Sequence, residues 1–406
     1  MTKFKVFLTI FLLIVFYFLV SVKQHNEKTE LVFWTVQLAP FTEYINGVIT
    51  DFEEQYPYIH VKWVDVPYAE AEKRVLASLL SNSVPDLVNI TSDFNMMLAR
   101  KGALLSVDGD MKECNEALKQ VLTYSDKVWG VPFYATSAIT IYNKDLLVDF
   151  GVKKIAKNYD DLWQQMQKAP MLQNKYLFMP TLTENDTLYK LLNKYEINNP
   201  QELGSDKAII LFDTLKSLYI NEKMPKEAIT QTHREVLEKY SSGQIAYLQT
   251  GANFLNIIKE NSLDVYEKTD VAPQFYGEKE GYDFSLMTLA VPKKAKNSKE
   301  AFLFAKFLTS EENQINFAKL TGILPCNKQS LNNEYFQNYD DDIVSKARYI
   351  GAKQLSSPIK YPIQNKSHKE IIEILNNLVA QVLVGNKDIT AELEQVQYKW
   401  KLLLEN

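Results

Sequence analysis

Aromatic and polar side chains stand at the ends of two hydrophobic runs in this 406-residue sequence. Trp34 and Gln37 lie at the end of the first run, and Ser92 and Asp93 follow a later one. A flat aromatic ring can stack on the apolar face of a sugar ring, while amide, hydroxyl and carboxylate groups bond to its hydroxyl rim. These residue types therefore favour binding of a small, hydroxyl-rich molecule.

A second set of candidates lies nearer the middle of the chain. Tyr134 and Thr136 belong to a β-run that follows a Gly-Val-Pro turn, and Phe284 begins another β-run. Each candidate also has a structural explanation, because Asp93 suits a helix cap and the pair Tyr134 and Thr136 could be spacers. Phe284 could belong to a core, since aromatic residues make up 12% of the chain.

Hydrophobic periodicity predicts the elements that position these residues. Short β-runs at 31–35, 59–66 and 86–90 alternate with amphipathic helical stretches, one ending at residue 56 and one spanning 69–81. This order predicts a parallel sheet. Because the carboxyl ends of parallel strands meet at one edge, we expect residues 34–37 and 91–93 at a common cleft.

The rest of the chain predicts a second lobe and then a return to the first. Residues 146–282 are rich in helical periodicity around a strand at 244–249. A strand at 284–291 leads to a helix at 297–309, and Thr309 with Glu312 forms a capping-box pattern for the next helix. A final helical part begins near residue 340.

Composition bounds the size and the partners of the protein. With 46% hydrophobic residues the chain can form two cores, because a single core stops growing at roughly 250–300 residues. The net charge of −5 comes from 45 basic and 50 acidic residues spread along the chain, so we expect no nucleic-acid partner. The four histidines are scattered, which disfavours a metal site. Cys114 and Cys326 could pair only if the fold brings them together.

An uncharged apolar segment at residues 6–22 lies between lysines near the N-terminus. This layout is typical of an export signal, so we expect the body of the protein outside the cytoplasm. The segment is longer than the usual signal core of roughly 7–15 residues, and no Ala-x-Ala cleavage site follows it. A cleaved signal peptide and a retained membrane anchor both remain open.

Several short motifs occur in a characteristic order. They are Leu31-Val-Phe-Trp34, Pro85-Asp86, Thr91-Ser-Asp93, Gly130-Val-Pro132, Tyr142-Asn-Lys-Asp145, Ser242-Gly-Gln-Ile-Ala-Tyr247 with Gly251, and Leu289-Ala-Val-Pro292. Over residues 31–404 the chain resembles the extracellular solute-binding proteins of bacterial ABC importers, in the sugar-binding branch that contains maltose-binding protein.

This resemblance implies a fold and a division into lobes. The fold would be a two-lobed α/β periplasmic-binding-protein fold of type II, in which each lobe is a mainly parallel sheet flanked by helices and three crossings join the lobes. A signal peptide or anchor would occupy residues 1–25. The first lobe would comprise residues 30–136 plus 284–328, and the second lobe residues 137–283 plus 329–406.

The resemblance also implies a function. Such a protein captures a carbohydrate, or a glycerol-phosphate-like polyol, between its lobes and delivers it to the transmembrane subunits of an ABC permease. It would be a monomer in the periplasm or at the cell surface, with no catalytic activity and no cofactor. By family position, Gly251, Asn253 and Phe254 join the candidate ligand-binding residues. Relatives carry a tryptophan near Asn253 and an acidic residue at Thr136, so we expect a ligand other than malto-oligosaccharides.

Two other functions remain open. An exported glycan-processing enzyme would need two carboxylates roughly 5–10 Å apart across a sugar site, and the sequence nominates no such pair. A tethered receptor that signals to a membrane sensor would share the same binding chemistry.

Overall fold

The computed structural model describes residues 28–81, 83–107, 111–359, 361, 367–385 and 387–405, so the expected signal or anchor at 1–25 lies outside it. None of the helices in these ranges is both long and apolar enough to cross a membrane. The chain divides into two compact units. Of the described residues, unit 1 contains those up to Ala135, Ser285–Thr321 and Pro325–Ser330, and unit 2 contains Thr136–Phe284, Gly322–Leu324 and those from Leu331 onward.

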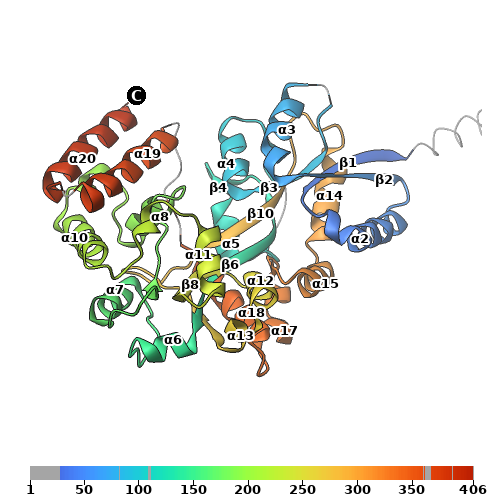
Figure 1. The fold of residues 1–406 in the computed structure, drawn as a ribbon. Coiled ribbons are helices and arrows are strands. Elements are labelled where there is room, and N and C mark those ends of the chain that lie inside the picture. The colour runs from blue at the N-terminus through green and yellow to red at the C-terminus, as the bar shows by residue number, and fades with distance from the viewer. Residues whose placement is uncertain are drawn as a thin grey trace, which may run out of the picture. The chain divides into compact units, whose positions relative to one another are not determined.

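Unit 1 contains strands that alternate with helices (Figure 1). Its strands are β1 (Thr29–Val36), β2 (Ile59–Val66), β3 (Leu87–Thr91), β4 (Thr123–Tyr124) and β5 (Lys127–Val128). Its helices are α2 (Thr42–Gln55), α3 (Tyr68–Leu80), α4 (Ser92–Arg100), α5 (Glu116–Val121), α14 (Ser298–Leu308) and α15 (Glu311–Thr321). Four elements belong partly to each unit: β6 (Val131–Asn143), β10 (Phe284–Ala290), β11 (Leu324–Pro325) and α16 (Lys328–Leu331).

The sheet of unit 1 has the strand order β2-β1-β3-β10, in which β10 alone runs antiparallel to its neighbour. Alternate residues of β1 face opposite sides of this sheet. Phe33 packs edge-on against Phe304 of α14, with ring centroids 5.3 Å apart. Trp34 and Val36 instead contact the apolar residues on the side of α3 and α4. The sheet is therefore covered by helices on both faces.

A buried carboxylate joins three segments of unit 1. Asp86 is only 3% exposed and precedes β3. Its carboxylate accepts hydrogen bonds from the backbone N–H groups of Val32 (3.0 Å), Lys296 (3.0 Å) and Asn297 (2.9 Å). Asp86 thereby fixes β1 and the start of α14 to the start of β3, which explains why an acidic residue stands here.

Unit 2 contains a smaller sheet and most of the helices (Figure 1). Its remaining strands are β7 (Tyr176–Phe178), β8 (Ile245–Gly251) and β9 (Thr269–Pro273). Its helices are α6 (Lys144–Asp149), α7 (Tyr159–Lys168), α8 (Thr187–Lys194), α9 (Pro200–Leu203), α10 (Asp206–Ile220), α11 (His233–Ser241), α12 (Phe254–Asn261), α13 (Leu263–Glu267), α17 (Glu334–Gln337), α18 (Ile343–Gln354), α19 (His368–Val379) and α20 (Ile389–Glu405).

The sheet of unit 2 is mixed. In the order β9-β6-β8-β7, strand β6 runs antiparallel to both β9 and β8, while β7 is parallel to β8. Strands β7, β8 and β9 thus run in one direction and β6 alone opposes them, just as β10 alone opposes the strands of unit 1, so both sheets are mainly parallel as expected. The helices α12 and α13 connect β8 to β9, as crossovers between parallel strands do, and β6 lies between these two strands and opposes both.

A buried ion pair anchors the segment that precedes β10 within unit 2. The Lys194 ammonium lies 3.0 Å from the Asp283 carboxylate, and the Lys194 side chain is only 2% exposed against 26% for Asp283. Gln274 Nε2 and the Tyr361 hydroxyl also donate to Asp283. Burial would raise the pKa of Asp283, but the charge of Lys194 and the hydrogen bonds from Tyr361 and Lys194 lower it below its ordinary value.

The backbone around this ion pair is equally constrained. The N–H of Ala138 in β6 donates to the carbonyl oxygen of Asp283 at 3.0 Å. Gly277 lies against the end of α8, where an added Cβ would be 1.9 Å from the Lys194 carbonyl oxygen. Only glycine fits at this position.

A second ion pair fixes α18 to the sheet of unit 2. Both carboxylate oxygens of Asp270 in β9 accept hydrogen bonds from Lys346 Nζ, at 2.7 and 2.9 Å. The Tyr142 hydroxyl of β6 donates to the same carboxylate at 2.8 Å. Burial acts to raise the pKa of Asp270, but the hydrogen bonds from Lys346, Val271 and Tyr142 outweigh it and lower the pKa.

Candidate functional site

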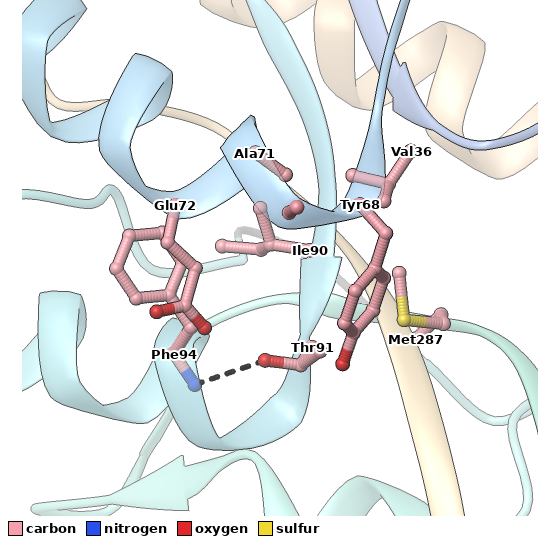
Figure 2. Close-up of a pocket in the computed structure, with 9 residues that line it drawn as sticks. Val36, Tyr68, Ala71, Glu72, Ile90, Thr91, Phe94 and Met287 are labelled. Carbon is pink, nitrogen blue, oxygen red and sulfur yellow. Dashed lines mark hydrogen bonds between the residues drawn. The ribbon is translucent and has the colours of Figure 1, made fainter.

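Unit 1 contains a pocket of about 290 Å³ at the carboxyl edge of its parallel strands (Figure 2). The strand ends contribute Val36, Ile90, Thr91 and Met287, and the adjacent helices contribute Tyr68, Ala69, Ala71, Glu72 and Phe94. The sequence predicted that the ends of β1 and β3 would meet at one edge. The pocket contains residues from both strand ends, which is where ligands bind in open α/β sheets.

The turn after β1 is held open beside this pocket by one carboxylate. Asp65 accepts hydrogen bonds from the Thr35 hydroxyl (2.6 Å) and from the backbone N–H groups of Leu38 and Ala39 (both 2.9 Å). Gln37 adopts a positive φ of 55° in this turn, and its side chain is exposed. The position of the turn is thus fixed by these hydrogen bonds together with the burial of Leu38.

The start of α4 lies at the same edge of the sheet, directly after the end of β3. The Thr91 hydroxyl accepts a hydrogen bond from the Phe94 N–H at 3.3 Å and so caps the helix, as Figure 2 shows. Ser92 is the half-buried first residue of α4, and Asp93 is exposed in its first turn. The cap that the sequence offered to Asp93 is therefore supplied by Thr91, while Asp93 sits at the positive end of the helix dipole.

Three polar groups face the pocket above an apolar floor. Figure 2 shows the hydroxyl groups of Tyr68 and Thr91 and the carboxylate of Glu72 at the same end of the lining residues. Tyr68 is 63% exposed, so one face of its ring is open to a ligand. Glu72 forms no ion pair or hydrogen bond with another described residue. An exposed ring beside a free carboxylate and a hydroxyl suits a ligand with apolar faces and hydroxyl groups.

Tyr134 lies near this pocket in the core of unit 1. Its ring is 5.1 Å from the ring of Phe133 and 5.8 Å from that of Phe317. Burial is the main cause that raises the pKa of the Tyr134 phenol, and the charges of Asp65 and Tyr68 add to it. The phenol therefore remains a hydrogen-bond donor at neutral pH.

Trp34 does not line the pocket. It lies two residues before the end of β1, opposite Val64 of β2 and Val88 of β3, and packs half-buried against the apolar residues below the pocket. Tyr68 and Glu72 line the pocket instead, and the sequence analysis missed both. They lie in the first two turns of the helix after β2, so extending the strand-edge argument into that helix would have found them.

The candidates Gly251, Asn253 and Phe254 of unit 2 lie together at the carboxyl end of β8. An added Cβ on Gly251 would lie 2.5 Å from Asn253 Oδ1, which shows how closely the Asn253 side chain folds over this glycine. Phe254 packs half-buried against the core, with its ring 5.1 Å from that of His233. Thr136 is two residues before Ala138, the partner of Gly251 in the sheet.

The remaining candidate, Phe284, is a half-buried residue at the start of β10, where the chain passes from unit 2 to unit 1. The binding roles of this residue and of the other candidates chosen from the sequence stay predictions.

The cysteines are both buried free thiols of unit 1. The fold does bring their segments together, but the residue opposite Cys114 is Asn327 rather than Cys326. Burial raises the pKa of Cys114 to about 11 and that of Cys326 well above its ordinary value. Within the described ranges, no three His, Cys, Asp or Glu side chains are placed to hold a metal ion together.

Known proteins resemble this chain in both sequence and fold. A binding protein of Brucella abortus is 21% identical over 379 residues, which cover 89% of this chain and 90% of the relative. The diacetylchitobiose binding protein of Streptomyces coelicolor is 23% identical over 317 residues, covering 73% and 71% of the two chains.

A crystal structure of an oligosaccharide periplasmic-binding protein from Synechococcus sp. MITs9220 has a TM-score of 0.80 at 23% identity. The match covers 92% of this chain and 99% of that chain, which confirms the expected fold. The sequence model of bacterial extracellular solute-binding proteins matches residues 38–315. This protein belongs to the family of bacterial extracellular solute-binding proteins.

Proposed function

We propose that this protein is the extracytoplasmic receptor of an ABC importer, that it captures a carbohydrate, and that it delivers this ligand to a membrane permease. Units 1 and 2 are the two lobes of the receptor. The observation that carries the proposal is the pocket at the strand edge of unit 1, where Tyr68, Glu72 and Thr91 stand over an apolar floor. The names of the relatives, which bind diacetylchitobiose and oligosaccharides, support a sugar.

The charge of the pocket distinguishes between the two ligand classes suggested by the sequence. The described lining residues include one carboxylate, Glu72, and no lysine or arginine. A phosphorylated polyol would bring a negative charge next to Glu72, which is unfavourable, whereas a neutral sugar can donate hydroxyl hydrogen bonds to it. We therefore favour a neutral oligosaccharide over a glycerol-phosphate-like compound.

The same lining argues against the enzymatic alternative. Hydrolysis of a glycosidic bond commonly uses two carboxylates on either side of that bond. Glu72 is the single carboxylate among the lining residues of this pocket. One carboxylate with an open aromatic ring suits binding rather than bond cleavage, in line with relatives that are binding proteins.

The test is a thermal-shift and calorimetry screen of the full chain against chito-, malto- and galacto-oligosaccharides, with glycerol phosphate as the charged comparator. A true ligand at 100 times its dissociation constant adds about 2.7 kcal/mol to the free energy of unfolding. We expect a neutral sugar to give this stabilisation and glycerol phosphate to give none. Stabilisation by no sugar in the screen would contradict the proposal.

Three variants test whether the sugar binds in the pocket of unit 1. We expect Tyr68→Ala to remove the ring platform and to weaken the sugar at least tenfold. Glu72→Gln exchanges a charged acceptor for a neutral one, so about a tenfold loss is expected. Glu70→Gln is the matched control, because Glu70 lies on the same helix but pairs with Arg74 at 2.6 Å and does not line the pocket. If Tyr68→Ala and Glu72→Gln bind the sugar as tightly as the control Glu70→Gln does, the sugar binds outside this pocket.

A further inference from the structure

Unit 2 contains a pocket of its own, with a volume of about 440 Å³. One wall is the loop between α6 and α7, and the other is the end of β9 with the segment that follows it. The lining residues are Lys154, Ile155, Ala156 and Lys157 from the loop, and Ala272, Pro273, Tyr276, Glu280 and Tyr282 from the opposite wall. The binding function proposed above does not use this pocket.

Backbone hydrogen bonds hold the two walls together. The N–H of Tyr276 donates to the Lys157 carbonyl oxygen at 3.3 Å, and the N–H of Tyr159 donates to the Tyr276 carbonyl oxygen at 3.0 Å. The loop is also tied to the sheet, because the Ala156 N–H donates to the Tyr247 hydroxyl at 3.4 Å. The pocket is therefore a fixed feature of unit 2.

Aromatic and aliphatic groups form the inner surface of this pocket. The rings of Tyr276 and Tyr282 meet edge-on, with centroids 6.4 Å apart and an interplanar angle of 88°. Tyr282 is buried, and its hydroxyl donates to Glu280 Oε1 at 2.9 Å. Ile155 and Pro273 complete the apolar part. A flat ring can lie against such a surface.

The charged groups that line this pocket differ in whether they already have a partner. Lys154 and Lys157 are exposed, and neither ammonium group forms an ion pair or hydrogen bond with another described residue. The Glu280 carboxylate, in contrast, already accepts the Tyr282 hydroxyl. The pocket thus presents two positive charges without a partner and one carboxylate, a net positive charge next to an apolar, aromatic surface.

We propose that this pocket of unit 2 is a second binding site, for a small organic anion that carries a flat apolar ring, such as an aromatic carboxylate or sulfonate. The ring packs on Tyr276 and the aliphatic residues, and the anionic group pairs with Lys154 and Lys157. The volume lies within the range of roughly 300–1,000 Å³ that is typical of small-molecule sites. The site shares no residue with the sugar pocket, because all of its residues belong to unit 2.

The test uses the full chain and 8-anilinonaphthalene-1-sulfonate, a fluorescent aromatic sulfonate, as the probe. We expect saturable binding that weakens by up to about fivefold in Lys154→Ala and in Lys157→Ala, the upper end of the range for one exposed charge pair. Lys153→Ala removes the same charge from the same loop but from a residue outside the lining, so it is the matched control. Ala272→Trp fills the pocket and should abolish this binding.

A further control separates the two sites. Tyr68→Ala alters only the pocket of unit 1 and should leave probe binding unchanged, whether or not a sugar ligand has been found. Absence of saturable binding, equal affinity in the Lys153 and Lys154 variants, or undiminished binding in Ala272→Trp would each overturn the proposal. Circular dichroism of every variant shows whether a loss of binding comes with a loss of structure.

Discussion

Replacing Asp283 by asparagine should destabilise unit 2 far more than an ordinary polar substitution would. The change keeps the size of the side chain but removes the charge that faces Lys194. With its side chain only 2% exposed, Lys194 cannot recover its hydration, and its ammonium would stay buried without a counter-ion. Removing one partner from a buried pair costs roughly 3–5 kcal/mol.

The opposite replacement, Lys194→Met, should be milder. It removes the buried charge itself and leaves Asp283 with the donors Gln274 and Tyr361 and with 26% exposure to water. We expect a loss of about 1.5–3 kcal/mol, the range for one hydrogen bond to a charged group. The double variant Asp283→Asn/Lys194→Met should be more stable than Asp283→Asn alone, since it holds no isolated charge.

Asp186→Asn, at the residue just before α8, is the control for the loss of a solvated ion pair. Asp186 pairs with Lys190 at 3.1 Å, with side-chain exposures of 30% and 43%. Solvated pairs of this kind contribute about 0–1 kcal/mol, so this variant should differ little from the parent chain.

Hydrogen exchange followed by mass spectrometry measures each unit separately. Peptides from β8 report on unit 2, and peptides from β2 of unit 1 serve as the internal reference. A loss of 3–5 kcal/mol makes global exchange of unit 2 roughly a hundredfold to a few thousandfold faster in Asp283→Asn. The reasoning is refuted if that variant exchanges within about fivefold of the parent, or if Lys194→Met is destabilised as much.

Three further predictions concern single positions. Asp86→Ala leaves three part-buried backbone N–H groups without an acceptor and should lower the stability of unit 1 by roughly 3 kcal/mol, seen as a lower urea midpoint. Gly277→Ala should destabilise unit 2 by over about 2 kcal/mol through its backbone clash, whereas Gly281→Ala, with its nearest neighbour at 3.4 Å, should be tolerated. The pKa of Asp270 lies below its ordinary value of 3.8, so its contribution is complete above that value and is lost as the pH falls through the lowered pKa. Urea unfolding between pH 6 and 3 should therefore show a smaller acid-induced loss in Lys346→Met.

Local patterns in the sequence predicted most strands well. The alternating run at 59–66 predicted β2 with the observed bounds Ile59–Val66, because alternation reports directly which face of a half-buried strand meets the core. The capping box predicted for Thr309 was wrong. Its hydroxyl donates backward to the Ala305 carbonyl oxygen at 2.9 Å, so it belongs to the end of α14.

The candidate pocket lies at the strand edge that the sequence predicted, but its lining residues differ from the candidates chosen from the sequence. The strand order placed the edge correctly, because parallel strands share an edge whatever their side chains are. Trp34 was expected there as a platform, yet its position within β1 directs it to packing below the pocket. A ring near a strand end reaches the edge only if the strand ends at that residue. Periodicity does not fix the end of a strand to within one or two residues.

Long-range bonds escaped the sequence analysis altogether. Asp86 meets Lys296 and Asn297 across more than 200 residues, and Asp283 meets Lys194 across 89. No local period links such positions, and a single sequence offers no other signal for them. The position of β6 between β8 and β9 was not predicted for the same reason, since the direction of β6 relative to β8 is set by the path of the whole chain.

The interleaved order of the two units has a consequence for biosynthesis. β3 finds its antiparallel neighbour only in β10, whose residues are translated nearly 200 positions later. Until residue 290 has been synthesised, β3 remains an edge strand with unpaired backbone N–H and C=O groups. Such an edge can pair with strands of other nascent chains. A chain truncated before this point should therefore form inclusion bodies rather than a stable half-molecule.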